Sequence, residues 1–180
     1  MIYNLVIEKP YEHLITVWEE ILKTIGEVDG HKLTIRQALP HDAMMLDIRE
    51  EQKDTFDNKD LDYLIRMHAW LNQLTPMNYT IFHGDKILMM ITVLVVLPGV
   101  AEISFLTDNN FVNASKPVKV SMIKAFHAAL RELPFRRLQA KVKEGFTIGT
   151  TFVEKLGFEP EGVLKNYGPT DNYIGYGLIK

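Results

Sequence analysis

Cysteine is absent from the 180-residue sequence, and its absence excludes several kinds of chemistry at once. Without thiols the chain forms no disulfide, no thiolate metal site and no cysteine nucleophile. The six histidines, at positions 13, 31, 41, 68, 83 and 127, lack the spacing of metal ligands, so we expect no metal site. A chain without cysteines suits a reducing compartment, and we expect a cytoplasmic protein.

Long hydrophobic runs and a strong charge of either sign are also missing. The longest apolar run, ILMMITVLVVLPGVA, is too short for a membrane helix and is broken by Pro98 and Gly99. The start, MIYNLVIEKPYEH, lacks the basic and apolar regions of a signal peptide. A formal net charge of -3 gives no reason to expect nucleic acid or an anionic membrane as a partner. The composition, 47% hydrophobic and 24% charged, is that of a globular protein, and the length fits one domain.

The first 38 residues predict a helix between two strands. YNLVIE, at residues 3–8, favours a short strand, and KLTIRQA, at 32–38, favours a longer one. Residues 11–25 have helical spacing, and Gly26 and the pair Asp29-Gly30 end this helix and form a turn. We expect its apolar face to pack against the domain or a partner chain; this face consists of Leu14, Trp18, Ile21, Leu22 and Ile25.

Two further helices are predicted before the middle of the chain. The first begins at Pro40, which suits a first helical turn, and is expected to bury Met44, Met45 and Ile48. The second covers residues 58–72, where one apolar stripe contains Leu61, Leu64, Ile65, His68 and Leu71.

The middle of the chain predicts an antiparallel meander followed by a crossover. NYTIF, KILMMITVLVV and AEISFLT are strand-like, and HGD and LPG between them are typical of turns. After the polar loop DNNFVNASKP, a helix starts near Pro117, and the strand RLQAKVK follows it. A strand, a helix and a strand over 101–143 indicate a right-handed parallel crossover. The expected buried residues are Met122, Phe126, Ala129, Leu130, Leu133, Leu138, Ala140 and Val142.

The segment VEKLGFEPEGVLKNY, at residues 153–167, indicates a helix end followed by a strand. A helix over 147–156 would bury Ile148, Phe152 and Leu156, with Gly157 as its left-handed cap and Phe158 entering the core. Two strands, FEPEGVLKN and NYIGYGLIK, close the chain. From residue 31 the predicted order is therefore β-α-α-β-β-β-α-β-α-β-β.

This order, with LTIRQALPHDAMML near the front and FVEKLGFEPEGVLKNY near the end, resembles the GNAT superfamily of N-acetyltransferases. The EKLGF and EG residues are most similar to the ribosomal-protein N-terminal acetyltransferase branch. The resemblance covers residues 31–180. It implies a single α/β domain with a mixed, mostly antiparallel sheet flanked by helices, preceded by a helical extension over residues 1–30. It also implies transfer of an acetyl group from acetyl-CoA to an amine.

The cofactor loop departs from the family's pattern. The family carries Gln/Arg-x-x-Gly-x-Gly/Ala between its fourth strand and the next helix, and the backbone N–H groups there bind the pyrophosphate of acetyl-CoA. This chain has NFVNASKPVKVSMI, with no glycine from 100 to 144 and with Pro117 lacking an N–H. By position, the resemblance assigns cofactor contacts to Phe105, Leu106, Thr107, Lys116, Val118 and Lys119. The plainer interpretation is that the two lysines form, with Lys124 and Arg131, the solvated face of a helix.

The catalytic positions depart from the pattern as well. The family often has an Asn seven residues before a Tyr that protonates the leaving thiolate, and these positions are Phe146 and Val153 here. Candidate general bases are Glu102 and Asp108, although a strand carboxylate in solvent and an Asp that ends a strand are the plainer interpretations. His127 is interpreted as a structural residue.

A few remaining side chains are interpreted in two ways. His83, in a turn, is expected to be solvated. The tyrosines at 167, 173 and 176 either pack on strands or form the wall of a groove. Phe111, in the polar loop, either plugs a vacant coenzyme site or contacts a partner.

Two functions of different class stay open. One is a working N-acetyltransferase that uses acetyl-CoA. The other, which both departures favour, is a GNAT-shaped protein without a cofactor, acting by binding a protein partner or another copy of itself. Chains of this degenerate build resemble internal or virion-associated proteins of tailed phages, which would place the protein in a virion. A cleft between the fourth and fifth strands of the fold is one feature that distinguishes the two.

Overall fold

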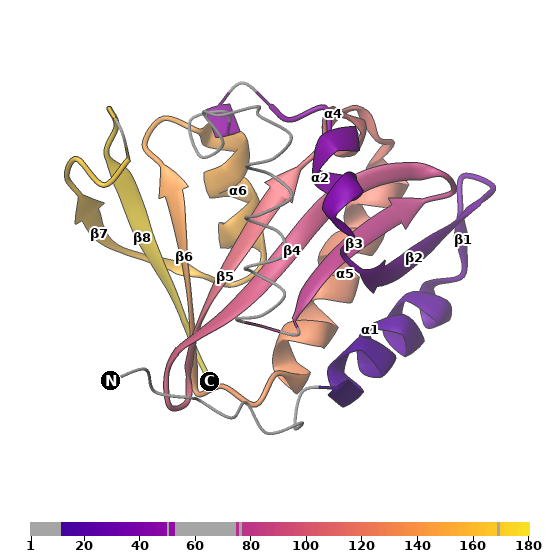
Figure 1. The fold of residues 1–180 in the computed structure, drawn as a ribbon, viewed down its shortest axis with the longest axis horizontal. Helices are drawn as coiled ribbons and strands as arrows, with labels where there is room; N and C mark the ends of the chain where they lie inside the picture. The colour runs from indigo at the N-terminus through magenta and orange to yellow at the C-terminus, as the bar shows by residue number, and fades with distance from the viewer. Residues whose placement is uncertain (1–11, 50, 53–74, 76, 169) are drawn as a thin grey trace.

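The computed structural model describes residues 12–49, 51–52, 75, 77–168 and 170–180, without the side chains of residues 12–14. Within these ranges, eight strands form one sheet in the order β1-β2-β3-β4-β5-β6-β8-β7 (Figure 1). The strands are β1 Glu27–Val28, β2 His31–Gln37, β3 Asn78–His83, β4 Lys86–Leu97, β5 Val100–Thr107, β6 Arg137–Lys143, β7 Glu159–Leu164 and β8 Tyr173–Ile179. The helices are α1 Glu12–Ile25, α2 Pro40–Met45, α4 Asn109–Asn113, α5 Lys116–Glu132 and α6 Thr147–Lys155. The fold is therefore the expected mixed, mostly antiparallel sheet flanked by helices.

The main hydrophobic core lies between the sheet and the helices α1, α5 and α6. Trp18 of α1 and Phe126 of α5 are both buried, and their rings meet edge to face with centroids 5.4 Å apart. Helices α1 and α5 lie side by side along this face (Figure 1). A smaller cluster lies beneath α2 and contains Ala38, Ala43, Leu46, Ile87 and Met90. The expected packing of the first helix against the domain is confirmed, because Trp18 is only 2% exposed.

The predicted meander and crossover are confirmed. Strands β3, β4 and β5 pair antiparallel in sequence, and β5 pairs parallel with β6 after the crossover through α5. On β6 the residues Leu138, Ala140 and Val142 face the core, as their alternation predicts. The end of α6 also agrees with the sequence, since Gly157 has φ +90° and Phe158 is buried. A glycine suits this position because other residues avoid positive φ.

Two predicted buried faces are wrong. On α2, Met44 and Met45 are exposed, whereas Asp42 and Ala43 are buried. The Asp42 carboxylate can be buried on this face because Arg36 and other donors satisfy its hydrogen-bonding capacity. On α6, Ile148 is 43% exposed, because the start of this helix lies along the rim of a cleft rather than beneath the sheet.

Some predictions differ or lie outside the described residues. The polar loop after β5 contains the short helix α4, capped by Asp108, whose carboxylate accepts from the N–H of Asn110. His83 is half-buried rather than solvated, and its Nε2 lies 2.7 Å from the carbonyl of Val28. The predicted strand at 3–8 and helix at 58–72 fall outside the described ranges.

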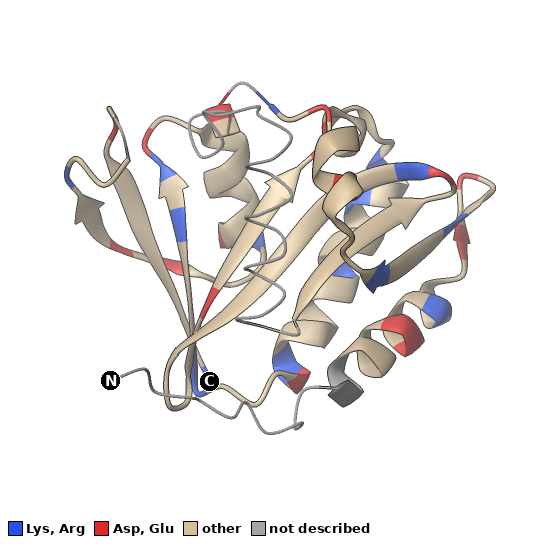
Figure 2. Cartoon of the chain, in the orientation of Figure 1, with Lys and Arg blue, Asp and Glu red and all other residues tan. Residues whose placement is uncertain are grey.

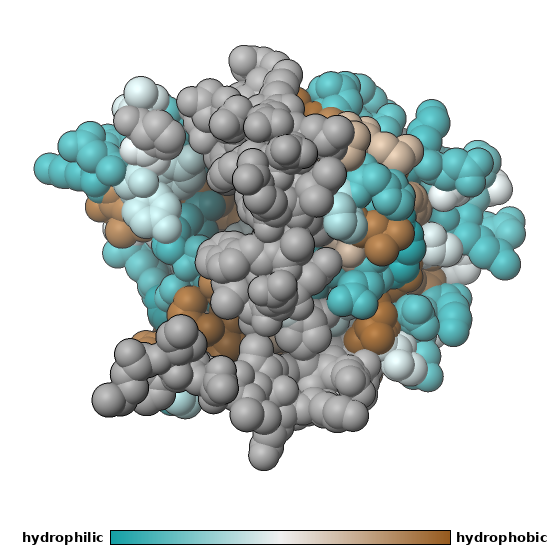
Figure 3. All heavy atoms as spheres, in the orientation of Figure 1, coloured by the Kyte–Doolittle hydropathy of each residue, from teal (hydrophilic) through white to brown (hydrophobic). Residues whose placement is uncertain are grey.

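Charged residues of both signs are distributed along the described chain (Figure 2). Basic and acidic residues alternate over the helices and strands visible in Figure 2, and neither sign gathers into one large area in this view. On the face drawn in Figure 3, the hydrophobic residues among the coloured atoms are visible in separate areas on either side of the grey atoms. Among the described residues, no helix is long and apolar enough to cross a membrane.

Candidate functional site

A cleft opens where β5 and β6 separate. The two strands pair only from Val100 opposite Arg137 to Glu102 opposite Gln139. Beyond these residues the described register ends, and a cleft of about 570 Å³ lies between the strands. Such a volume is within the usual range for small-molecule sites. The cleft between these strands is the feature that the sequence left open, and the fold provides it.

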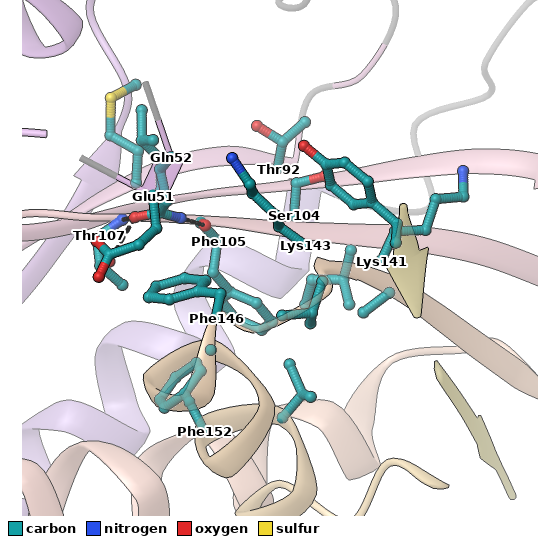
Figure 4. Close-up of a pocket in the computed structure, with 18 of the residues that line it drawn as sticks. Glu51, Gln52, Thr92, Ser104, Phe105, Thr107, Lys141, Lys143, Phe146 and Phe152 are labelled. Carbon is teal, nitrogen blue, oxygen red and sulfur yellow. Dashed lines mark hydrogen bonds between the residues drawn. The ribbon is translucent and has the colours of Figure 1, made fainter. Parts of the chain in front are cut away.

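Phenylalanines fill the side of the cleft nearest α6 (Figure 4). The Phe152 ring meets those of Phe105, Phe111 and Phe126 edge to face, at centroid distances of 5.2, 5.7 and 5.8 Å. Edge-to-face contacts of this kind stabilise aromatic clusters beyond the burial of their area. Phe111, expected either to plug a coenzyme site or to contact a partner, is 6% exposed and belongs to the cleft wall. The cleft therefore has an apolar floor of packed aromatic rings.

The ammonium group of Lys141 lies on the opposite wall of the cleft. Lys141 donates to Glu102 Oε2 at 2.5 Å and to the Tyr167 hydroxyl at 2.7 Å, and its ammonium lies 4.7 Å from the Tyr167 ring centroid. Burial by itself lowers the pKa of Lys141, but the hydrogen bonds and charge of Glu102 and Tyr167 outweigh burial and raise the pKa. Lys141 is thus held protonated and paired, so it is not an available amine nucleophile.

Gln52 occupies hydrogen-bonding groups on the open edge of β5 (Figure 4). Its Nε2 donates to the carbonyl of Phe105 at 2.8 Å. Its Oε1 accepts from the Thr107 N–H at 3.1 Å and from the Thr107 hydroxyl at 2.6 Å. These contacts begin where β6 has left the ladder, so a side-chain amide satisfies backbone groups that a neighbouring strand would otherwise satisfy.

The N-terminus of α5 is occupied by groups from the chain itself. Ser115 is the N-cap: its Oγ accepts from the Val118 N–H at 3.4 Å and donates to the carboxylate of Asp29. The carbonyl of Ser115 accepts from the Lys119 N–H at 3.1 Å. Pro117 has no N–H. The Asp29 carboxylate therefore stands beside the helix end to which the resemblance assigns a pyrophosphate.

The predicted cofactor residues divide between two places. Phe105, Leu106 and Thr107 line the cleft. The other three lie at the start of α5: Lys116 is exposed, Val118 is buried and Lys119 is half-buried. These three residues do not belong to the cleft lining that the structure describes.

The two predicted general bases lie in different surroundings. Glu102 lines the cleft and is paired with Lys141. Asp108 is 1% exposed, and its two oxygens accept from the N–H groups of Asp47 and Asn110. Burial raises the pKa of Asp108, the two hydrogen bonds oppose this, and the nearby Asp47 charge adds to it. Asp108 therefore fastens α4 to the segment at residue 47, and it is not among the described residues that line the cleft.

The positions that the resemblance assigns to the thiolate acid do face the cleft. Phe146 and Val153 are both buried and both line it. Neither side chain has a proton to donate. Two of the three tyrosines considered in the sequence, Tyr167 and Tyr173, line the cleft, whereas Tyr176 is buried and donates to Glu154.

Sequence reasoning missed Gln52, Lys141 and Lys143 as cleft residues. The two lysines are the outward members of an alternating strand, so their positions were readable but their surroundings were not. Gln52 carried no signal, because it is distant in sequence from the strand that it contacts. Among the described residues, no group of three or more histidines and carboxylates forms a metal site.

Comparison with known proteins identifies the fold. No protein-family profile and no curated protein matches the sequence. Solved structures do match: spermidine N-acetyltransferase from Vibrio cholerae, crystallised with CoA and spermine, has a TM-score of 0.64 and 11% identity over 82% of this chain and 95% of its own. Ribosomal-protein-alanine N-acetyltransferase from Brucella melitensis matches with a TM-score of 0.60 and 18% identity, over 81% of this chain and 99% of its own. A GNAT-family acetyltransferase from Bacillus anthracis matches with a TM-score of 0.60 and 16% identity, over 82% of this chain and 94% of its own. At these identities the likeness shows the GNAT fold.

Proposed function

We propose that this GNAT-fold protein acts by binding, with the cleft between β5 and β6 as its binding site, and does not transfer acetyl groups from acetyl-CoA. The proposal rests chiefly on the N-terminus of α5. There Asp29 and Ser115 use the helix end internally, and Pro117 removes a donor. A pyrophosphate approaching this end would meet a carboxylate instead of converging N–H groups.

The electrostatic balance supports the same conclusion. A hydrogen bond to a charged group contributes about 1.5–3 kcal/mol, and several such bonds hold a phosphate at a helix end. Lys116 is exposed at this end, and an exposed charge pair contributes only about 0–1 kcal/mol. One surface lysine therefore does not offset the lost N–H groups and the repulsion from Asp29.

The chemistry of the cleft adds a second argument. The two positions assigned to the thiolate acid are hydrophobic, and the cleft carboxylate Glu102 is held by Lys141. A general base must have an oxygen free for the proton of the attacking amine, whereas Oε2 of Glu102 already accepts a hydrogen bond from the Lys141 ammonium. The residues of the cleft fit a ligand with apolar surface better than they fit acetyl transfer.

The alternative is an active N-acetyltransferase, and the separation of β5 from β6 is the observation that favours it. In that case Glu102 and Asp108 would be the first general bases to examine. Phe105, Leu106 and Thr107 would then contact acetyl-CoA along the cleft, with Lys116, Val118 and Lys119 at its phosphates.

Calorimetric titration with acetyl-CoA distinguishes the two functions. We expect no binding at micromolar concentrations, and no release of free thiol when acetyl-CoA is incubated with polyamines or with peptides bearing a free N-terminus. Micromolar binding with turnover would refute the proposal. Asp29→Asn keeps the shape of the turn and removes its charge, so this variant should bind acetyl-CoA more tightly than the wild type if Asp29 opposes the phosphates.

The partner in this proposal is a protein, either another chain or a second copy of this one. Size-exclusion chromatography with light scattering tests self-association. A place in the virion of a tailed phage is the finer form of the proposal, and mass spectrometry of purified particles from the source would detect the protein there. Its absence from such particles would contradict this finer form of the proposal.

A further inference from the structure

We propose that the open edge of β5 is a strand-addition site for an extended peptide segment of a protein partner, and that the Gln52 side chain closes this site in the free protein. The inference deepens the proposed binding function, on which it rests, by naming the class of partner. It is drawn from three hydrogen bonds of Gln52 and from the point at which the β5–β6 ladder stops.

The geometry of the Gln52 contacts is that of a parallel strand. In a parallel ladder, one residue donates its N–H to the carbonyl of residue j−1 and accepts at its own carbonyl from the N–H of residue j+1. The Gln52 carboxamide donates to the carbonyl of Phe105 and accepts from the N–H of Thr107. It therefore occupies the place of one strand residue opposite Leu106.

The parallel hydrogen-bond pattern of the Gln52 carboxamide matches the parallel pairing of β5 with β6. Strands β5 and β6 are parallel, and their register ends at Glu102 opposite Gln139. The parallel hydrogen bonding between β5 and β6 ends at Glu102, and Gln52 forms hydrogen bonds of the same kind opposite Leu106, four residues further along β5. Among the described residues, no strand pairs with this edge of β5 beyond Glu102, and a partner with backbone amides can form the same hydrogen bonds as the Gln52 carboxamide.

The cleft also suits the side chains of an added strand. Side chains of a strand alternate between the two faces, so half of those on the incoming segment would meet the phenylalanine floor. Phe105 and Phe152 provide that floor, and their rings are already held edge to face. On the other face Lys141 and Glu102 form a paired polar rim that presents no net charge to the segment. The site therefore fits an extended peptide with apolar residues at alternate positions and little charge.

Closure by Gln52 has a measurable consequence. A peptide must displace the carboxamide before it pairs with Phe105 and Thr107, so Gln52 competes with its own ligand. Removing this competition should tighten binding, whereas removing an ordinary contact residue would weaken it. The direction of the change thus separates an internal competitor from a structural or contact residue.

The test is fluorescence anisotropy with the pentapeptide acetyl-Thr-Val-Lys-Val-Thr-amide, labelled with fluorescein on its lysine. We expect Gln52→Ala to bind it about tenfold more tightly than the wild type, from the net value of one to two hydrogen bonds. Gln52→Glu should also bind more tightly, because a carboxylate cannot donate to the carbonyl of Phe105. Gln37→Ala, an exposed glutamine on β2, is the matched control and should leave the affinity unchanged.

A second peptide, N-methylated at every residue, lacks the N–H donors by which those residues pair with a neighbouring strand, and it should not bind any of the proteins. Amide hydrogen exchange then locates the contact: the Thr107 N–H should exchange faster in Gln52→Ala and become protected again when the peptide is added. Equal or weaker binding by both Gln52 variants, binding of the N-methylated peptide, or no binding by any protein would overturn the inference. Acetyl-CoA turnover alongside peptide binding would overturn only the proposed function.

Discussion

Replacing Asp42 by Asn is expected to destabilise the protein strongly, although Asp42 is not among the described residues that line the cleft. Its side chain is fully buried and accepts from four donors. Arg36 donates twice, at 2.7 and 2.6 Å, the Leu39 N–H donates at 2.8 Å, and the Thr80 hydroxyl donates at 2.7 Å. This carboxylate therefore joins α2 to β2 and β3.

The magnitude follows from the number of donors. An asparagine has one oxygen with two lone pairs, so at least two of the four donors would lose their acceptor or face the new NH₂ group. A hydrogen bond to a charged group contributes about 1.5–3 kcal/mol. Arg36 is 39% exposed, so water recovers part of its loss, whereas the Thr80 hydroxyl is buried and recovers none. We therefore expect Asp42→Asn to lower the free energy of unfolding by about 3 kcal/mol at neutral pH.

The pH dependence gives this prediction a specific sign. Burial by itself raises the pKa of Asp42, but the hydrogen bonds from Arg36, Leu39 and Thr80 and the charge of Arg36 outweigh it and lower the pKa. A folded pKa below the unfolded value of about 3.9 stabilises the protein above that value, and the stabilisation is lost as the pH falls through the folded pKa. The difference between the wild type and Asp42→Asn should therefore be largest near pH 6 and smaller at pH 3.

Urea denaturation of both proteins at pH 6 and pH 3 measures this difference. Asp85→Asn, an exposed aspartate in the β3–β4 turn, serves as the matched control and should change stability little at either pH. A loss below about 1 kcal/mol at pH 6, or a loss that is the same at both pH values, would refute the reasoning.

Three further predictions test the rest of the fold. Phe158→Ala should cost about 3–5 kcal/mol in denaturant unfolding, because Phe158 is a core residue; a loss below 1 kcal/mol would place it outside the core. Gly157→Ala should cost about 1–2 kcal/mol in thermal unfolding, since Gly157 has φ +90° and a side chain there is strained; an unchanged melting temperature would contradict this. For Asp108→Asn the sign is opposite to that of Asp42: burial raises the pKa of Asp108, so the wild type loses stability as the pH rises through the interval between the unfolded and folded values. The variant should therefore gain relative to the wild type in urea titrations as the pH rises from about 4, and a relative loss would argue against a buried, disfavoured charge.

Local patterns determined most of the secondary structure. The alternation of Leu138, Ala140 and Val142 and the apolar stripe containing Trp18 each specify a buried face, because burial is decided by the period of the element that carries it. The pair Gly157-Phe158 was equally readable, since a positive φ and a strand start depend on neighbouring residues alone. Where the apolar pattern was short, as at Met44 and Met45, the prediction of the buried face was wrong. A six-residue helix has too few turns for its pattern to outweigh the tertiary partners of Asp42.

The sequence by itself determined the order of the elements, the parallel crossover, the glycine cap and the missing functional groups at Phe146, Val153 and Pro117. Each of these follows from the identity of a residue or from short-range spacing. Only the tertiary structure decided that β5 and β6 separate after Glu102, that Asp29 stands beside Ser115, and that Gln52 lies on the edge of β5. The residue pairs involved are Glu102 with Gln139, Asp29 with Ser115, and Gln52 with Thr107, which lie 37, 86 and 55 positions apart in sequence. No local period specifies such pairs. They depend on how the whole sheet twists and packs, which is why the candidate site could not be assembled before the fold was known.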